Sequence, residues 1–305
     1  MSIKKILLFS FIIIMIPFII VTIFIRDDEI TLNFSSNTIV RVYREKDNVI
    51  SRVPIEKYVI GVLGGEVPAT FEEEALKAQA VASRTYVMYQ MEKNHDKDYD
   101  VVDTVSNQVY QNEEELKTKW GDEYLNNVNK IKKVVLDTAG QYLTYNGQVI
   151  ESFFFSTSTG YTENSEDVFS AALPYLRQVK SEWDKISPLY TDSVEYSKME
   201  FYSLLELEYQ NVLNINIKEK TETGRIKKIE INGQTFTGKQ ICSKLKLRST
   251  CFDIKDNGEN ISINTKGFGH GVGMSQYGAQ GMALEGYTYD KILKYYYTGV
   301  EIDNF

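Results

Sequence analysis

The 305-residue sequence has few of the residues that build metal centres and disulfide frameworks. Its two cysteines and two histidines are too few for a four-ligand structural zinc site without carboxylates, and they cannot form a network of disulfides. With only 5 prolines and 43% hydrophobic residues, the composition is that of an ordinary globular protein, not of a disordered or collagen-like one. We expect neither a metal nor a cofactor.

Positive charge is also in the minority. The chain has 34 Lys and Arg residues against 42 Asp and Glu residues, a formal net charge of −8 with a pI of about 5.1. A chain of this sign is repelled by the phosphates of nucleic acids unless a local patch reverses it. We therefore expect no nucleic-acid partner.

One long apolar run stands near the N-terminus. Residues 6 to 25 contain no charged side chain, and these 20 residues are enough to cross a bilayer as a helix. Lys4 and Lys5 precede the run, so the positive-inside rule leaves residues 1–5 in the cytoplasm and residues 26–305 outside. A cleaved signal peptide is the alternative, but its apolar core is usually about 7 to 15 residues long and ends at a small-residue site, which is missing here. We predict a single-pass protein of the cell membrane.

The remaining sequence mixes helical and strand patterns without a regular βαβ alternation, which indicates an α+β fold. We expect one large domain of mixed sheet and helices, with a possible sub-domain at 195–265. Residues 93 to 121 are polar and poorly periodic. Helices are predicted at 54–63, from about 70 to 92, near 125–139, at 275–284 and at 289–297. Strands are predicted at 31–34, 38–43, in a hairpin over 142–155, and at 215–220, 225–231 and 249–254.

Glu66 is the first candidate for chemistry. It follows a glycine pair expected to end the first helix, and its neighbours Val62, Leu63, Val67 and Phe71 are apolar. Such surroundings raise the pKa of a carboxyl group, so Glu66 could stay protonated near neutral pH and act as a general acid. A solvated loop glutamate is the alternative.

Arg84 falls within the apolar stripe of the second predicted helix, whose start matches a capping box at residues 70–73. A guanidinium buried there needs a partner, either a protein carboxylate such as Glu66 or a polar ligand. An arginine that reaches the surface along its own stem is equally compatible with the pattern.

Two further stretches and the cysteines leave alternatives open. The row of hydroxyls after Phe153-Phe154-Phe155 could bind a polyhydroxylated ligand or form an ordinary loop. In the glycine-rich stretch from 267 to 281, His270 could ligate a metal, transfer protons or be packed. Cys242 and Cys251 could pair or remain thiols.

Four motifs in order resemble the stage II sporulation protein D family: GEVPATFEEEALKAQAVASRTYV, FFFSTSTGYTENSEDVFSAALPYLRQVKSEWD, LKLRSTCF and GFGHGVGMSQYGAQGMA. The resemblance covers roughly residues 30 to 303. It implies a lytic transglycosylase that cuts peptidoglycan glycan strands lacking stem peptides, in a long substrate groove, during engulfment of the forespore. It also implies, as partners, the stage II sporulation proteins P, an amidase, and M, a membrane scaffold, at the sporulation septum or engulfing membrane.

The resemblance also assigns residues. Glu66 matches the catalytic acid of the family, and Arg84 matches the arginine of the A-x-S-R-T helix that supports activity, so we expect Arg84 to bind substrate. Ser156, Ser158, Tyr175, His270 and Gln276 fall in motifs expected to line the glycan groove. The sequence departs from the family pattern at Thr159, where glycine is usual, and at Cys242, where a charged residue is commoner.

A single carboxyl group suffices for the implied reaction, because it can donate a proton to the glycosidic oxygen and then accept one from the 6-hydroxyl of the same sugar. A hydrolase would need a second carboxylate about 5 to 9.5 Å away, for which Glu166 and Asp167 are the candidates. The rival function is a non-catalytic protein that binds peptidoglycan and stimulates an amidase, as the related amidase enhancers do.

Overall fold

The computed structural model describes residues 15, 30 and 37–305. The predicted membrane-spanning segment at 6–25 and the strand predicted at 31–34 fall on residues that, Met15 apart, are not among these. Within the described part of the chain, no helix is both long and apolar enough to cross a membrane.

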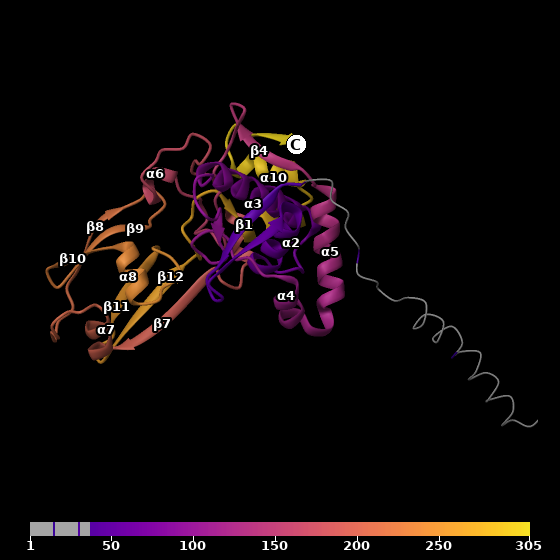
Figure 1. The fold of residues 1–305 in the computed structure, drawn as a ribbon. Helices are drawn as coiled ribbons and strands as arrows, with labels where there is room; N and C mark the ends of the chain where they lie inside the picture. Colours follow the sequence, from indigo (N-terminus) through magenta and orange to yellow (C-terminus); the bar gives the residue numbers. More distant parts are fainter. Residues whose placement is uncertain (1–14, 16–29, 31–36) are drawn as a thin grey trace, which may run out of the picture.

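The described residues form a mixed α+β structure, as predicted (Figure 1). Its α-helices are α2 (Ile55–Glu66), α3 (Glu73–Lys93), α4 (Glu113–Trp120), α5 (Tyr124–Asp137), α6 (Ser165–Val168), α7 (Lys198–Leu204), α8 (Gly238–Lys244), α9 (Gln276–Leu284) and α10 (Tyr289–Tyr296). Two 3-10 helices are η1 (Gly121–Glu123) and η2 (Glu182–Ile186).

The strands are short and belong to several small sheets. They are β1 (Ile39–Arg44), β2 (Val49–Pro54), β3 (Val101–Val102), β4 (Gln141–Tyr145), β5 (Gln148–Val149), β6 (Phe154–Phe155), β7 (Thr191–Ser197), β8 (Ile215–Lys220), β9 (Ile226–Ile231), β10 (Gln234–Thr237), β11 (Phe252–Asp256), β12 (Asn260–Lys266), β13 (Met274–Ser275) and β14 (Glu301–Asn304). The sheets have the orders β2-β1-β3, β14-β4-β5, β13-β6, β10-β9-β8 and β11-β12-β7.

Helix α3 runs through the larger hydrophobic core and packs against α2, α5, α9 and α10. Its buried residues include Leu76, Ala80 and Val87 of the apolar stripe predicted from the sequence, but burial extends around nearly the whole helix between Ala75 and Val87. We call this core and the helices around it the helical body.

The end of α2 differs from the prediction. The helix begins after Pro54, as expected, but it continues through Gly64 and Gly65 and includes Glu66. A Cβ atom on Gly65 would collide with the backbone carbonyl of Val109, and one on Gly64 would meet the Leu116 side chain. The glycines therefore allow close packing against the following segment, and do not stop the helix.

The start of α3 is also a correction. The capping box predicted at residues 70–73 does not form, because the N-cap residue is Glu72 and no side chain caps the helix. Instead, the backbone N–H of Glu72 donates to Oε1 of Gln280, 2.7 Å away on α9. A tertiary contact has replaced the local one.

One strand prediction is confirmed, whereas its partner strand and one helix were missed. The strand expected at 38–43 is β1, and it pairs with the unpredicted β2 in an antiparallel hairpin and with β3 in parallel. Helix α4 falls in the polar stretch for which no element was predicted, and it is held by a capping box in which Asn112 and Glu115 bond reciprocally.

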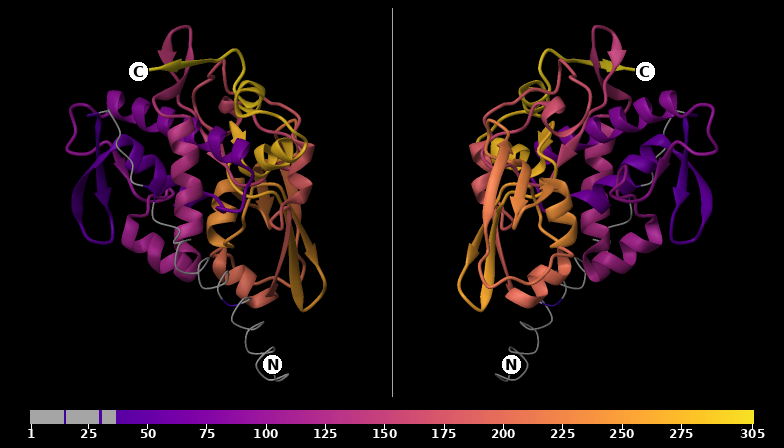
Figure 2. Two further views of the ribbon diagram at one scale, coloured as in Figure 1. Left: turned by 90° about the vertical axis from the view of Figure 1, so that its right-hand side faces the viewer. Right: turned by 90° about the vertical axis from the view of Figure 1, so that its left-hand side faces the viewer.

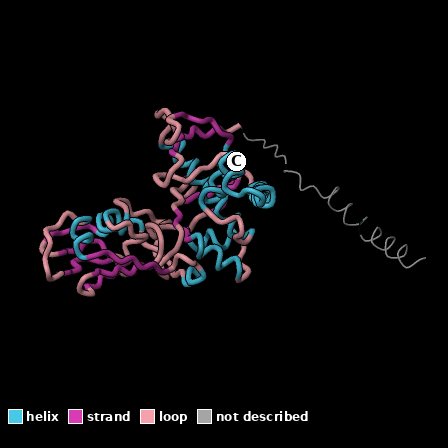
Figure 3. The backbone as a smooth tube through the Cα atoms, turned by 90° about the horizontal axis from the view of Figure 1, so that it is seen from below, coloured by secondary structure: helices cyan, strands magenta, loops and turns pink. Residues whose placement is uncertain are grey.

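A second hydrophobic core lies to one side of the helical body (Figures 1 and 2). It joins α7 and α8 to the sheets β10-β9-β8 and β11-β12-β7. Figure 3 shows the strands of these two sheets extending away from the helical body. Cys242 and Cys251 lie here as free thiols. The Cys242 thiol donates to the carbonyl of Ser249, and burial raises its pKa to about 12.

The glycine-rich stretch returns the chain from this second core to the helical body. It ends in β13, which pairs in parallel with β6. Gly273 lies directly against the Phe153 carbonyl with a φ of +81°, so any side chain here would be both strained and obstructed. The stretch thereby leads into Ser275 and Gln276 at the start of α9.

Candidate active site

Glu66 is the last residue of α2, and its side chain is partly buried. Burial raises the pKa of its carboxyl group above the ordinary value. Three neighbours oppose the shift: the backbone N–H of Val109, which donates to Oε1 at 2.7 Å, the amide of Gln276 and the charge of Lys119. The net result is a raised pKa, as an acid catalyst requires.

The segment before α4 holds this carboxyl group in place. It packs on α2 where Gly61 and Gly65 leave room, and the N–H of Gln111 donates to the carbonyl of Gly61 at 3.2 Å. Val109 therefore reaches Glu66 only because position 65 has no side chain.

Gly65→Ala is expected to lower the free energy of unfolding by about 1–3 kcal/mol, although alanine is the better helix former. The added methyl group must displace the rigid backbone of Val109. Urea unfolding measures the effect. Gly64→Ala is the matched control, since its methyl group meets only the Leu116 and Trp120 side chains, which can shift. A Gly65→Ala protein more stable than the parent would contradict this packing.

Gln276 comes to Glu66 from the other end of the sequence. Ser275 caps α9 by accepting from the N–H of Gly278 at 3.3 Å, and Gln276 follows as the first helical residue. Its side chain is only 6% exposed and lies near enough to Glu66 to lower the pKa of that carboxyl group. Its Nε2 has no other hydrogen-bond partner among the described residues, so this buried donor is left to the carboxyl group of Glu66.

A hollow of about 160 Å³ is lined in part by Tyr86, Asn107, Phe153 and His270, and its link to Glu66 is through Tyr86. The hydroxyl of Tyr86 accepts from Nδ2 of Asn107 at 2.9 Å, and the negative charge of Glu66 contributes to the raised pKa of that tyrosine. We call this space the acid-side hollow. Its aromatic walls and polar edges suit a sugar ring.

His270 is a neutral ring at the edge of this hollow. Burial lowers the pKa of His270 to about 4, with Arg225 adding to the effect. Its Nδ1 accepts from the N–H of Val272 at 3.1 Å, so the single proton of the neutral ring is on Nε2. The ring packs edge-on against Phe153, with centroids 5.9 Å apart.

Ser158 lies beneath the surface, not on it. Asp184 is fully buried and accepts from the backbone N–H of Ser158 at 2.7 Å, from its hydroxyl at 2.8 Å and from the hydroxyl of Ser181 at 2.5 Å. Ser275 donates to the same carboxylate. The hydroxyl groups of Ser158, Ser181 and Ser275 therefore bond a buried carboxylate and not a ligand. Through Asp184 they connect the start of α9 to the loop after β6.

Arg84 is likewise an interior residue. Its guanidinium is 0% exposed and bonds Glu56, with Nε to Oε1 at 3.0 Å and Nη2 to Oε2 at 2.5 Å. Its partner is therefore a protein carboxylate, as one alternative required, but not Glu66. Glu56 precedes Glu66 by ten residues on α2, which is about 15 Å along a helix.

Tyr175 is 8% exposed and its hydroxyl accepts from the N–H of Glu151 at 3.2 Å, which places it in the helical body. Ser156 is less buried, and its carbonyl accepts from the N–H of Tyr277 at 3.0 Å, beside Gln276. Of the residues singled out from the sequence, the structure thus brings Gln276 to Glu66, places Ser156 next to Gln276 through Tyr277, and puts His270 in the wall of the hollow.

Several neighbours of the acid were missed. Lys119 of α4 donates to the carbonyl of Gly64 at 2.6 Å, and its charge acts on Glu66. Asn107 and Val109 precede α4 in the stretch that has no periodicity. The only sequence signal for this region was the Asn-x-x-Glu pattern that starts α4.

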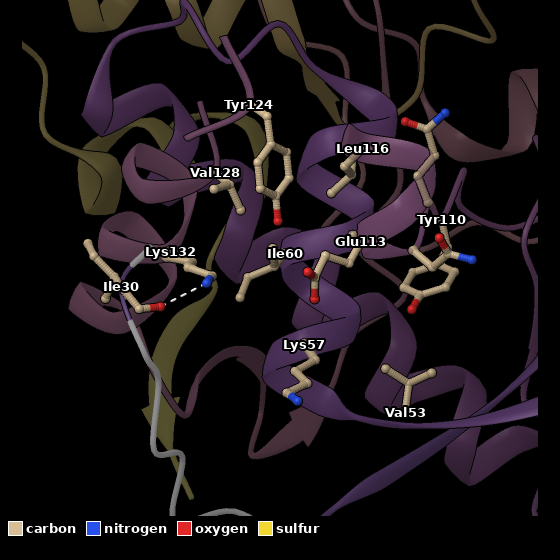
Figure 4. Close-up of a pocket in the computed structure, with 13 residues that line it drawn as sticks. Ile30, Val53, Lys57, Ile60, Tyr110, Glu113, Leu116, Tyr124, Val128 and Lys132 are labelled. Carbon is tan, nitrogen blue, oxygen red and sulfur yellow. Dashed lines mark hydrogen bonds between the residues drawn. The ribbon is translucent and has the colours of Figure 1, made fainter. Parts of the chain in front are cut away.

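A larger cavity of about 430 Å³ lies elsewhere, between α2, α4 and α5 (Figure 4). Figure 4 shows Ile60, Leu116 and Tyr124 pointing into it, with Lys132 donating to the carbonyl of Ile30 at its edge. Glu66 lines neither this cavity nor the acid-side hollow, but its charge acts on Tyr86 in the wall of the hollow. We therefore regard the acid-side hollow, although smaller, as the candidate active site.

Comparisons with known proteins agree with the motifs. The family model described as "Stage II sporulation protein" matches residues 43–145, which include Glu66. The chain is 46% identical over 266 residues to the stage II sporulation protein D of Bacillus subtilis (strain 168), covering 86% of this chain and 78% of that protein. It is 45% identical over 268 residues to its namesake in Bacillus amyloliquefaciens, covering 86% and 78%.

A more distant relative is named differently. An amidase enhancer of Bacillus subtilis (strain 168) is 29% identical over 300 residues, which is 80% of this chain and 40% of that protein. The two sporulation proteins match more strongly and along most of their own length. The chain therefore belongs to the stage II sporulation protein D family.

Proposed function

We propose that this protein is a membrane-anchored lytic transglycosylase that cuts peptidoglycan glycan strands lacking stem peptides during sporulation. The observation that carries the proposal is Glu66, a partly buried carboxyl group with a raised pKa that is contacted by the amide of Gln276 and acts on Tyr86 in an aromatic hollow. Its membership of a sporulation family supports the biological setting. Residues 6–25 would be the anchor, with the enzyme outside the cytoplasm.

The proposed reaction uses Glu66 twice. Its protonated carboxyl group donates to the glycosidic oxygen, and the bond from that oxygen to C1 of N-acetylmuramic acid breaks. The carboxylate then accepts the proton of the 6-hydroxyl as its oxygen bonds to C1. The products are a 1,6-anhydro end and a chain with a new free hydroxyl, and Glu66 recovers its proton.

A hydrolytic reaction has less support, because the two candidate second carboxylates are engaged elsewhere. Glu166 pairs with Arg177 at 2.5 Å, and this pairing lowers the pKa of Glu166 to about 2. Asp167 lies 3.5 Å from Nζ of Lys227. Neither is among the neighbours that shift the pKa of Glu66.

Digestion of peptide-free glycan strands tests the proposal directly. The full-length protein in detergent should yield 1,6-anhydro ends by mass spectrometry. Reducing ends in their place would reject the transglycosylase mechanism, and unchanged strands would favour the second candidate, a binding protein that stimulates an amidase. The amidase enhancer relative is the observation behind that alternative. The stage II sporulation proteins P and M are proposed as partners of either form.

The pH dependence of cleavage should report on Gln276. Its amide lowers the pKa of Glu66, so Gln276→Leu should raise that pKa further. Because the acid form must donate the first proton, activity falls as pH rises through the pKa, and the variant's alkaline limb should move to higher pH. Rate measurements across pH on the same strands give the shift.

Gln280→Leu is the control, one helical turn along α9. Gln280 accepts from the N–H of Glu72 and makes no contribution to the pKa of Glu66, so its loss should affect stability and leave the pH limb in place. An alkaline limb that stays fixed in Gln276→Leu would show that the amide does not act on the acid.

A further inference from the structure

The second core and the glycine-rich stretch enclose a pocket of about 380 Å³ whose charge opposes that of the chain. Its lining includes four cations, Arg225, Lys227, Lys239 and Arg248, and one acid, Asp167. The whole sequence carries a net charge of −8. We call this space the basic pocket; a local reversal of charge in a pocket of this size suits an anionic small group.

Arg225 is the buried cation of the basic pocket. Its side chain is 2% exposed, Nη1 donates to the carbonyl of Gly269 at 2.8 Å, and Nε lies 3.2 Å from Oε1 of Glu163. Nη2 completes no hydrogen bond with the described residues. Burying a guanidinium this deeply is unfavourable unless its N–H groups are hydrogen-bonded. The Nη2 group of Arg225 can therefore still donate to a bound anion.

Lys239 is the cation best placed to bind one. Its Nζ donates to the carbonyl of Val168 at 2.7 Å and lies 5.5 Å from the ring of Phe169. None of the ion pairs among the described residues includes it, whereas Arg248 has Asp192 at 3.3 Å and Lys227 has Glu219 at 3.1 Å. Two of the three donor positions of an ammonium group are therefore left for a ligand.

The basic pocket is adjacent to the acid-side hollow. His270 lines both spaces and is a wall that they share. We infer that one linear ligand contacts both, with one unit at the hollow and another at the basic pocket.

We propose that the basic pocket is a subsite for a carboxylate carried on a saccharide, with Lys239 as its principal cation. The inference rests on the proposed function, in which the ligand is a glycan strand without stem peptides. Removal of the peptide from muramic acid leaves a free lactyl carboxylate, whereas the amide of an intact stem is neutral at that position. The basic pocket would thus favour binding of glycan strands from which the stem peptide has been removed.

Binding measurements test the proposal without relying on cleavage. The probe is a set of peptide-free glycan strands, used once with free lactyl carboxylates and once with these carboxylates coupled to methylamine as neutral amides. The full-length Glu66→Gln protein keeps the strands intact. We expect the free carboxylates to bind about tenfold more tightly than the amides at low salt, with the difference shrinking as salt is added.

Lys239→Gln in the same background should remove most of this preference, by weakening binding of the carboxylate strands about tenfold and of the amide strands less than twofold. Lys244→Gln is the matched control, because Lys244 lies on the same helix and pairs with Glu206 outside the basic pocket. Equal binding of both strand forms, or equal losses in both lysine variants, would overturn the proposal. A protein that shows the preference yet never cuts strands would refute only the proposed enzyme.

Discussion

Glu66→Gln should reduce the rate of glycan cleavage by about 10²–10⁴-fold, the range that a general acid contributes. Glutamine has nearly the same shape, and its oxygen can still accept the 2.7 Å hydrogen bond from the N–H of Val109. It cannot donate a proton to a leaving oxygen or take one back. The measurement is the initial rate of anhydro-end formation from peptide-free strands.

Glu72→Gln provides the comparison, because Glu72 is an exposed glutamate six residues away. Its rate should equal that of the parent within twofold, and both variants should unfold at the same urea concentration as the parent. Cleavage that persisted in Glu66→Gln would remove the acid from its proposed role, and the amidase-stimulating alternative would then be preferred.

Arg84→Met should lower the free energy of unfolding by about 3–5 kcal/mol, the cost of leaving one member of a buried ion pair alone. Glu56 is 2% exposed and accepts two bonds from Arg84 and one from the N–H of Gly140 at 3.1 Å. Without the guanidinium, this carboxylate must stay charged in the core or take up a proton. Urea unfolding of the full-length protein measures the loss.

Two companion variants separate this effect from a role in binding. Lys133→Met breaks the exposed pair with Glu73 and should cost less than about 1 kcal/mol. The double variant Arg84→Met with Glu56→Leu removes both charges, so it should recover much of the stability lost in Arg84→Met alone. If Arg84→Met had unchanged stability but no longer bound glycan, the result would contradict the structural role and would support the substrate-binding role that the family resemblance implied.

The helices that could be predicted were those with sustained apolar spacing. Helices α5, α9 and α10 lie within two residues of their predicted bounds. Helices α5 and α10 each bury one apolar face, whereas α9 is buried on nearly all sides and starts at its N-cap residue Ser275. Helix α4 was missed, since its only buried residue is Leu116 and a helix with one apolar contact leaves no periodic pattern. The capping box predicted at residues 70–73 was wrong, because Gln280, which is distant in the sequence, accepts the hydrogen bond from the backbone N–H of Glu72.

The candidate site could also be predicted only in part. The acid at position 66 could be inferred from its apolar neighbours and its motif, but the contacts that Val109 and Gln276 make with it could not. Ser158 was expected to face a ligand, because the sequence does not reveal that Asp184, 26 residues later, accepts a hydrogen bond from its hydroxyl. Arg84 was linked to Glu66 because Glu66 stood out by its motif, and the sequence does not show which carboxylate of α2 faces α3; the structure shows that it is Glu56.

The carboxylate of Asp184 joins Ser158 and Ser275 across more than a hundred residues, and Gln276 follows directly. The amide that faces the acid is thus contributed by a residue 210 positions after Glu66. A nascent polypeptide that does not yet include Asp184 and Ser275 has Glu66 but lacks the contacts that position Gln276 opposite it. The surroundings of the acid are therefore completed only once the segment containing α9 has been synthesised.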